Sequence, residues 1–170
     1  IYFKDKAQVA TDVPMINVAL SGDMDGGMSS GLTVLAGPSK HFKTSFALVM
    51  AAAYLKKHKD AIMLFYDSEF GSPQSYFENY NILDKHWHDD ICELNAKKYK
   101  YKIDLLVGGS PCQSFSMVGK RGGLEDTRGT LFYEFAKRVQ ECNPKVILAE
   151  NVKGLQSHDN GRTLTTICNV

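Results

Sequence analysis

LTVLAGPSKHFKTSFALVMAAAYLKKHKDAIMLFYD, residues 32–67, is the stretch that decides the fold of this chain. It opens with a short apolar run at residues 32–36, which predicts a strand. A polar loop follows, and apolar residues then recur at helical spacing over about residues 44–58. A second apolar run occupies residues 61–66. Strand, loop, helix and strand in this order and length predict a βαβ unit with parallel strands.

Two more apolar runs lie further along, at residues 103–107 and 146–149. Runs that are apolar at every position are typical of parallel strands that are buried on both faces. Between them, residues 130–141 carry apolar side chains at helical spacing and predict a crossover helix, and residues 73–80 predict a short helix. The predicted fold class is therefore α/β, a three-layer parallel sheet with helices on both faces.

Composition restricts the protein class but does not reveal the function. The 170 residues are 44% hydrophobic and carry a net charge of +1, which suits one globular domain and excludes disorder and charged tails. No apolar run approaches the roughly 18 residues of a membrane span. Four cysteines form no CxxC pair and no secretory leader is visible, so we expect a soluble protein in the cytoplasm of a bacterium or a phage-infected host cell.

The loop GPSKHFKT, residues 37–44, follows a predicted strand and opens a predicted helix, which is the context of a phosphate-binding loop. Gly37 begins the loop, Lys43 can neutralise nucleotide phosphates, and the Thr44 hydroxyl can bind magnesium. Phe42 stands where the usual pattern has glycine, and a side chain there restricts the backbone. The alternative reading is a chance turn that carries a lysine.

Neighbouring motifs extend this first constellation. TDVP, ALSG, GGM, LAGPSK and FYDSEFG occur in this order within residues 11–71. Together they closely resemble the RecA-type strand-exchange recombinases of tailed bacteriophages, over about residues 12–82, including a phenylalanine in the loop. The resemblance implies binding of ATP and Mg²⁺, single-stranded DNA as a partner, and Glu69 as the carboxylate that polarises the attacking water. A solvated carboxylate is the alternative for Glu69, and the family's second magnesium-binding aspartate and DNA loops do not follow Ile82.

A second constellation begins at GGSPCQSFS, residues 108–116, directly after the third predicted strand. Cys112 is thus expected at the carboxyl end of a parallel sheet, where α/β proteins build their sites. Small neighbours leave its thiol accessible, which a nucleophile requires. A lone cysteine is more often a buried apolar residue, and we expect that of Cys92, Cys142 and Cys168.

The motifs around and after Cys112 point to one family. PCQ at residues 111–113, RGTLF at residues 128–132 and ENVK at residues 150–153 occur in the order and at the spacings of the DNA (cytosine-5) methyltransferases, which residues 88–170 resemble. The resemblance implies that Cys112 adds to carbon 6 of a flipped cytosine. It also implies that Glu150 holds and protonates ring nitrogen 3, with S-adenosylmethionine as methyl donor.

The same resemblance implies further contacts. Asp90 would contact the cofactor adenine, and a loop that closes over the base would bring the DNA-binding residues Gln113, Ser116, Lys120, Arg121 and Arg128.

The two resemblances divide the chain into segments 1–82 and 83–170, a phosphate-loop unit joined to a partial Rossmann-like methyltransferase unit. The predicted function is that of a DNA (cytosine-5) methyltransferase fragment fused to an ATP-binding segment. The alternatives are a fragment of an ATP-dependent recombination and repair protein, and an inactive α/β remnant. The family's glycine-rich cofactor loop is replaced by recombinase-like sequence, and the oligomeric state is left open.

Overall fold

The computed structural model of this chain describes residues 8–38, 40–66, 74–82, 86–87, 96–109, 130–151 and 165. Its elements in chain order are α1 (Pro14–Ser21), β1 (Gly31–Ala36), α2 (Lys43–Lys57), β2 (Met63–Tyr66), α3 (Gln74–Glu78), β3 (His86–Trp87), the 3-10 helix η1 (Ala96–Tyr99), β4 (Leu105–Gly109), α4 (Thr130–Cys142) and β5 (Val146–Asn151).

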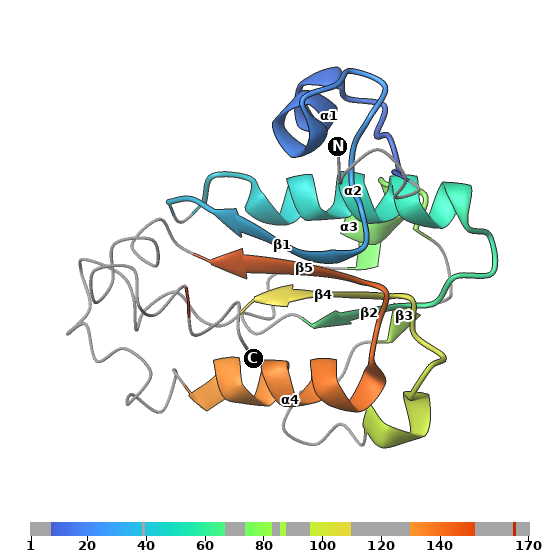
Figure 1. The fold of residues 1–170 in the computed structure, drawn as a ribbon, viewed down its shortest axis with the longest axis vertical. Helices are drawn as coiled ribbons and strands as arrows, with labels where there is room; N and C mark the ends of the chain where they lie inside the picture. Colours follow the sequence, from blue (N-terminus) through green and yellow to red (C-terminus); the bar gives the residue numbers. More distant parts are fainter. Residues whose placement is uncertain are drawn as a thin grey trace.

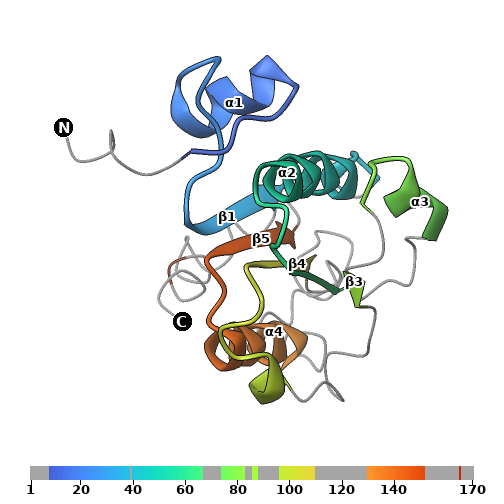
Figure 2. The ribbon, with the colours of Figure 1, turned by 90° about the vertical axis from the view of Figure 1, so that its right-hand side faces the viewer.

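The strands form one five-stranded sheet with the order β1-β5-β4-β2-β3, and its four strand pairings are all parallel. Helices α2 and α3 cover one face of this sheet, and α4 and η1 cover the other (Figures 1 and 2). The structure thus confirms the predicted α/β fold with three layers. Because the strands are parallel, their carboxyl ends lie along one edge of the sheet.

The core has two parts, one on each face of the sheet. Along β4, Leu105 and Val107 pack in the cluster under α2, whereas Leu106 packs in the cluster under α4. The helices complete these clusters with fully buried side chains such as Leu48 of α2 and with Phe135 of α4. Burial on both faces explains why the strands are apolar at every position, as the sequence predicted.

The strand order mixes the two predicted segments. Strand β1 of the first segment pairs with β5 of the second, with Leu35 opposite Glu150 and Ala36 opposite Asn151. On the other side, β4 pairs with β2. One sheet therefore contains strands from both segments, and the division at residue 82 stays a prediction.

Some element bounds differ from the predicted ones. The strand expected at 103–107 lies at Leu105–Gly109, and β5 continues to Asn151, two residues beyond the predicted end. Strand β4 ends later than predicted because Gly108 and Gly109 still pair with residues of β5. Both extensions carry the strands further toward the carboxyl edge of the sheet, where the candidate residues lie.

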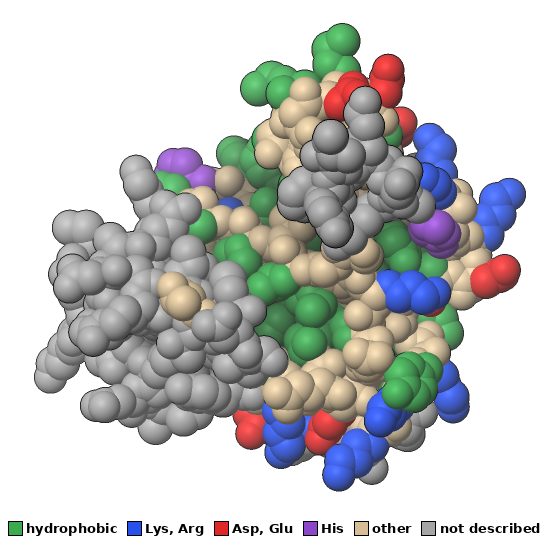
Figure 3. Space-filling model, viewed as in Figure 1, with side chains coloured by type: hydrophobic (Ala, Val, Ile, Leu, Met, Phe, Trp, Pro, Cys, Tyr) green, Lys and Arg blue, Asp and Glu red, His purple; other side chains and the backbone are tan. Residues whose placement is uncertain are grey.

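Helix α1 was not predicted from the sequence. It lies outside the layer formed by α2 and α3, on the side away from the sheet (Figures 1 and 2). Its buried Asn17 accepts hydrogen bonds from the backbone N–H and the hydroxyl of Thr11, both at 2.8 Å. Apolar side chains gather at the outer tip around α1 (Figure 3), where Met15 is 82% exposed. None of the helices in the described ranges is long and apolar enough to cross a membrane.

Candidate functional site at the carboxyl edge of the sheet

Three strand ends and one helix start meet at the carboxyl edge of the sheet. Strand β1 ends at Ala36, β5 at Asn151 and β4 at Gly109, and the parallel register holds these ends nearly level. Helix α2 begins at Lys43 at the same edge, because the loop after β1 returns the chain onto the sheet. This arrangement brings the phosphate-loop residues next to Glu150.

A hydrogen bond joins the two predicted constellations. The Thr44 hydroxyl donates to Oε2 of Glu150 at 2.8 Å, across 106 positions of sequence. Both side chains are partly buried. Glu150 is two residues after Leu148 on β5, and residues two apart in a strand point to the same face of the sheet. Leu148 packs in the cluster under α2, so the Glu150 side chain lies on the α2 face. Two residues predicted for different chemistries therefore share one contact.

The loop predicted to bind phosphate, which follows β1, is held to the sheet at its start. The backbone N–H of Gly37 donates to the carbonyl of Asn151 at 3.1 Å, which continues the contact between β1 and β5 beyond the strand. At its end, the Lys43 ammonium donates to the carbonyl of Pro38 at 2.7 Å. Phe42 has a φ of 56°, in the left-handed region that glycine adopts most freely, and its side chain is 73% exposed. The backbone thus takes a glycine-like conformation where the usual pattern has glycine.

The glycine pair at the end of β4 lets the neighbouring strands come close. A Cβ at Gly108 would lie 2.9 Å from Cβ of Tyr66 on β2. A Cβ at Gly109 would lie 2.6 Å from the carbonyl oxygen of Glu150 and 3.0 Å from its Cβ. Glycine at position 109 is therefore a condition for the position of Glu150.

Several predicted site residues fall outside the described part of the chain. They are Glu69, Asp90, Cys112, Gln113, Ser116, Lys120, Arg121 and Arg128. Of the predicted set, the structure brings together Gly37, Lys43, Thr44 and Glu150. Strand β4 ends at Gly109, which pairs with Glu150 in the sheet. In the sequence, Cys112 is the third residue after Gly109.

Cys142 has the structural role that the sequence predicted for it. Its side chain is fully buried at the end of α4. Burial, and secondarily the charge of Glu141, raises the pKa of this thiol to about 11. Cys142 is therefore protonated at neutral pH and is not a nucleophile, whereas Cys92 and Cys168 lie outside the described residues.

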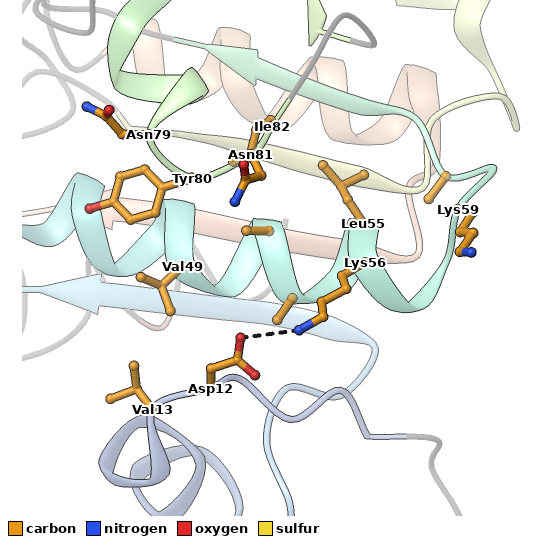
Figure 4. Close-up of a pocket in the computed structure, with 13 residues that line it drawn as sticks. Asp12, Val13, Val49, Leu55, Lys56, Lys59, Asn79, Tyr80, Asn81 and Ile82 are labelled. Atoms are coloured by element: carbon orange, nitrogen blue, oxygen red, sulfur yellow. Dashed lines mark hydrogen bonds and ion pairs between the residues drawn. The ribbon is translucent and has the colours of Figure 1, made fainter.

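A pocket of about 700 Å³ lies on the outer side of α2, away from the carboxyl edge (Figure 4). Val49, Ala52 and Leu55 of α2 line it together with residues 79–82. At its rim, Lys56 forms an ion pair with Asp12 at 3.4 Å. No predicted site residue lines this pocket, so it is separate from the candidate site.

Two features of the site had weak or no sequence signal. The pairing of Thr44 with Glu150 had none, because the partners are 106 positions apart. Gly109 had a weak signal, since a glycine at a strand end indicates close approach of another backbone. Asn151, buried and bonded through its carbonyl to Gly37, lies within the predicted ENV motif, but its backbone role is not visible in sequence.

Comparison with known proteins identifies the second constellation. Residues 55–170 match the family model of the C-5 cytosine-specific DNA methylases. The chain is 57% identical over 81 residues to the type II methyltransferase M.Eco47II of Escherichia coli. The aligned stretch covers 48% of this chain and 19% of that protein. The chain is also 49% identical over 81 residues to a recombination and repair protein of Enterobacteria phage T4, covering 48% of this chain and 21% of that protein.

These relatives are much longer proteins, and the chain spans about a fifth of the length of each. Among solved structures, domain III of the Thermotoga maritima replication initiation protein DnaA has a TM-score of 0.45 at 16% identity, over 81% of this chain and 51% of that chain. The family match covers more than half of the chain. The chain therefore belongs to the C-5 cytosine-specific DNA methylase family.

Proposed function

We propose that this chain is a catalytic fragment of a DNA (cytosine-5) methyltransferase, in which Cys112 is the nucleophile and Glu150 the acid. The observation that carries the proposal is the neighbourhood of β4 and β5. Glu150 lies beside Gly109 at the carboxyl edge, and Cys112 follows Gly109 by three positions in the sequence. Family membership over residues 55–170 supports both roles.

Carbon 5 of cytosine is a poor nucleophile, which explains the need for both residues. Addition of the Cys112 sulfur to carbon 6 opens the 5,6 double bond and pushes its electron pair into the ring. Glu150 stabilises this charge by giving a proton to ring nitrogen 3 and accepting a hydrogen bond from the exocyclic amine. Carbon 5 is then the nucleophilic centre of an enamine. Later loss of the carbon-5 proton to water, with departure of the Cys112 sulfur and return of the ring-nitrogen-3 proton to Glu150, restores the aromatic ring.

S-adenosylmethionine supplies the electrophilic methyl group when it is bound, and family membership supports its use. Asp90 is proposed to contact the adenine of this cofactor, because the sequence around it resembles that of the DNA (cytosine-5) methyltransferases. Duplex DNA is the proposed partner, and its target base must leave the stack before Cys112 can reach carbon 6. Gln113, Ser116, Lys120, Arg121 and Arg128 are the residues proposed to contact that DNA.

Exchange of the cytosine carbon-5 proton for deuterium tests the proposal without methyl transfer. A single-stranded oligonucleotide serves as substrate, because its bases cost less to unstack. We expect slow exchange that is lost in Cys112→Ala and strongly reduced in Glu150→Gln, which can hydrogen-bond but cannot deliver a proton. Cys142→Ala, the matched removal of a buried thiol, should keep the exchange. Exchange that persists in Cys112→Ala would contradict the proposal.

Nucleotide binding at the phosphate loop is a second candidate function. The observation that favours it is the contact of Thr44 with Glu150 beside Lys43, because hydroxyl and carboxylate oxygens are ligands that Mg²⁺ prefers. In this candidate, Lys43 contacts the phosphates, Thr44 binds magnesium, and Glu69 polarises water. The phage T4 protein that the chain resembles is named for recombination and repair, which favours the related alternative of a recombination and repair protein fragment.

Calorimetry with ATP and Mg²⁺ tests this candidate. We expect weak binding that is lost in Lys43→Ala and kept in Lys56→Ala, whose lysine lies near the opposite end of α2 and is exposed. Equal heats for the wild type and Lys43→Ala would contradict it. A chain that shows neither nucleotide binding nor proton exchange would fit the inactive remnant instead.

A further inference from the structure

We propose that Thr44 is a positioning residue for Glu150, whose carboxylate it holds in the orientation that meets a cytosine ring. The inference rests on the proposed function of Glu150. Its basis is the hydrogen bond of 2.8 Å from the Thr44 hydroxyl to Oε2 of Glu150. Thr44 belongs to the phosphate loop and lies outside the family's PCQ and ENV motifs.

The backbone of Glu150 is fixed on both sides. It is the second-last residue of β5, and it lies opposite Leu35 of β1 and Gly109 of β4. The missing side chain at Gly109 allows the close approach of β4 to the Glu150 backbone. What the sheet leaves undetermined is the rotation of the glutamate side chain, and Thr44 acts on that rotation.

Thr44 is fixed as well. It is the second residue of α2, whose Ala47 and Leu48 are fully buried against the sheet. As a β-branched residue in a helix it is restricted to about two side-chain rotamers, and the hydrogen bond to Glu150 selects one direction of its hydroxyl. The hydrogen bond therefore connects two rigid elements.

Electrostatics favour the same orientation. The first turn of α2 contains no acidic residue, and its N-cap Phe42 makes no side-chain capping bond. The start of a helix carries a partial positive charge from its free N–H groups, which favours a nearby carboxylate. Before it carries the proton that it gives to the ring, Glu150 is ionised and supplies that negative charge from the neighbouring strand. Helix α2 and Thr44 thus hold its carboxylate near the helix start.

A carboxylate that is oriented before the base arrives affects the chemical step more than substrate binding. Removing the Thr44 hydroxyl should therefore lower kcat of proton exchange and leave KM for the oligonucleotide nearly unchanged. Thr44→Val keeps the shape and loses the donor, whereas Thr44→Ser keeps the donor. All measurements are made without nucleotide or Mg²⁺, so that the phosphate-loop candidate does not contribute.

Two measurements on the full 170-residue chain test the proposal. The first is the rate of carbon-5 proton exchange in the oligonucleotide for the wild type, Thr44→Val and Thr44→Ser. The second is the ¹³C resonance of the Glu150 carboxyl carbon, assigned by its loss in Glu150→Gln. We expect Thr44→Val to lower kcat about tenfold, since the hydrogen bond that orients the acid is lost, and to shift the Glu150 resonance. Thr44→Ser should restore both.

The outcomes separate this inference from the proposed function. A wild-type chain that shows no proton exchange overturns the proposed function of Glu150 itself. Wild-type exchange with an unmoved Glu150 resonance in Thr44→Val overturns the positioning role alone. So does a shifted resonance with unchanged kcat, because the contact would then exist without serving the reaction.

Discussion

Gly109 on β4 and Glu150 on β5 are paired so closely that a Cβ at position 109 would lie 2.6 Å from the Glu150 carbonyl oxygen. Real Cβ atoms do not come this close to a backbone oxygen, so any side chain at position 109 must push the two strand ends apart. The distance between β4 and β5 at the carboxyl edge, where Glu150 lies, thus depends on one glycine.

Gly109→Ala should therefore destabilise the protein. We expect a loss of about 1–3 kcal/mol in the free energy of unfolding, because the added methyl group meets backbone that cannot rotate away. Gly37→Ala is the matched control on the same edge, since its Cβ would lie 3.7 Å from the nearest atom, the Cδ of Lys43. Urea denaturation measures both, and equal stabilities of the two variants would refute this account of Gly109.

Arg138 of α4 is expected to be more important for stability than its exposed neighbour Lys137. The Arg138 side chain is 7% exposed and contacts Glu141 at 2.6 Å and Glu134 at 2.9 Å. Arg138→Ala leaves the partly buried Glu141 without this cation and should cost about 3 kcal/mol. Lys137→Ala loses an exposed contact of 3.9 Å with Glu134 and should cost less than about 0.5 kcal/mol. Thermal or urea unfolding of both variants measures the difference between the two losses in free energy of unfolding. Equal losses in Arg138→Ala and Lys137→Ala would show that the burial of Arg138 has no role.

Cys142 should resist alkylation in the native protein. Its thiol is fully buried and its raised pKa keeps it protonated at about pH 8, so no thiolate is available to react. We expect mass spectrometry after iodoacetamide treatment to find Cys142 unmodified in the folded chain and modified in urea. Rapid modification of Cys142 without denaturant would show that α4 opens readily at its end.

The raised pKa of Cys142 predicts that the protein loses stability at alkaline pH. Between its ordinary pKa of 9.0 and its raised pKa of about 11, Cys142 keeps its proton in the folded state and loses it in the unfolded state. The folded state then binds more protons, so a rising pH in this window favours unfolding.

The measurement is the free energy of unfolding across this window in the wild type and in Cys142→Ala. Burial also raises the pKa of Tyr54, which contributes in the same direction to both proteins. We therefore expect the wild type to lose stability more steeply than Cys142→Ala. Identical slopes would mean that Cys142 titrates alike in the folded and unfolded states.

The sequence predicted the types of most elements because the signals for them are local. The apolar run at residues 61–66 and the helical spacing after Thr44 correspond to β2 and α2. Three short elements were missed, namely α1, β3 and the four-residue 3-10 helix η1. Strand β3 has only two residues, too few for a periodic pattern, and α1 is largely exposed, so no buried stripe marks it.

The candidate site was predictable in its parts. Lys43 and Thr44 follow from a phosphate-loop pattern, and Glu150 from its motif and family, each read from a few neighbouring residues. The roles of Cys112 and the DNA-contacting residues stay predictions, since those residues lie outside the described part of the chain.

By itself, the sequence of this protein determined its α/β class and its parallel strands and named candidate residues for chemistry, because hydrophobic periodicity and motif spacing are local features of the chain. Only the tertiary structure decided that β1 pairs with β5 and that Thr44 bonds to Glu150. Every apolar strand can be buried in several positions of a sheet, and periodicity does not distinguish among them. The order goes together with the packing of the two faces against α2 and α4, and these contacts join residues far apart in sequence.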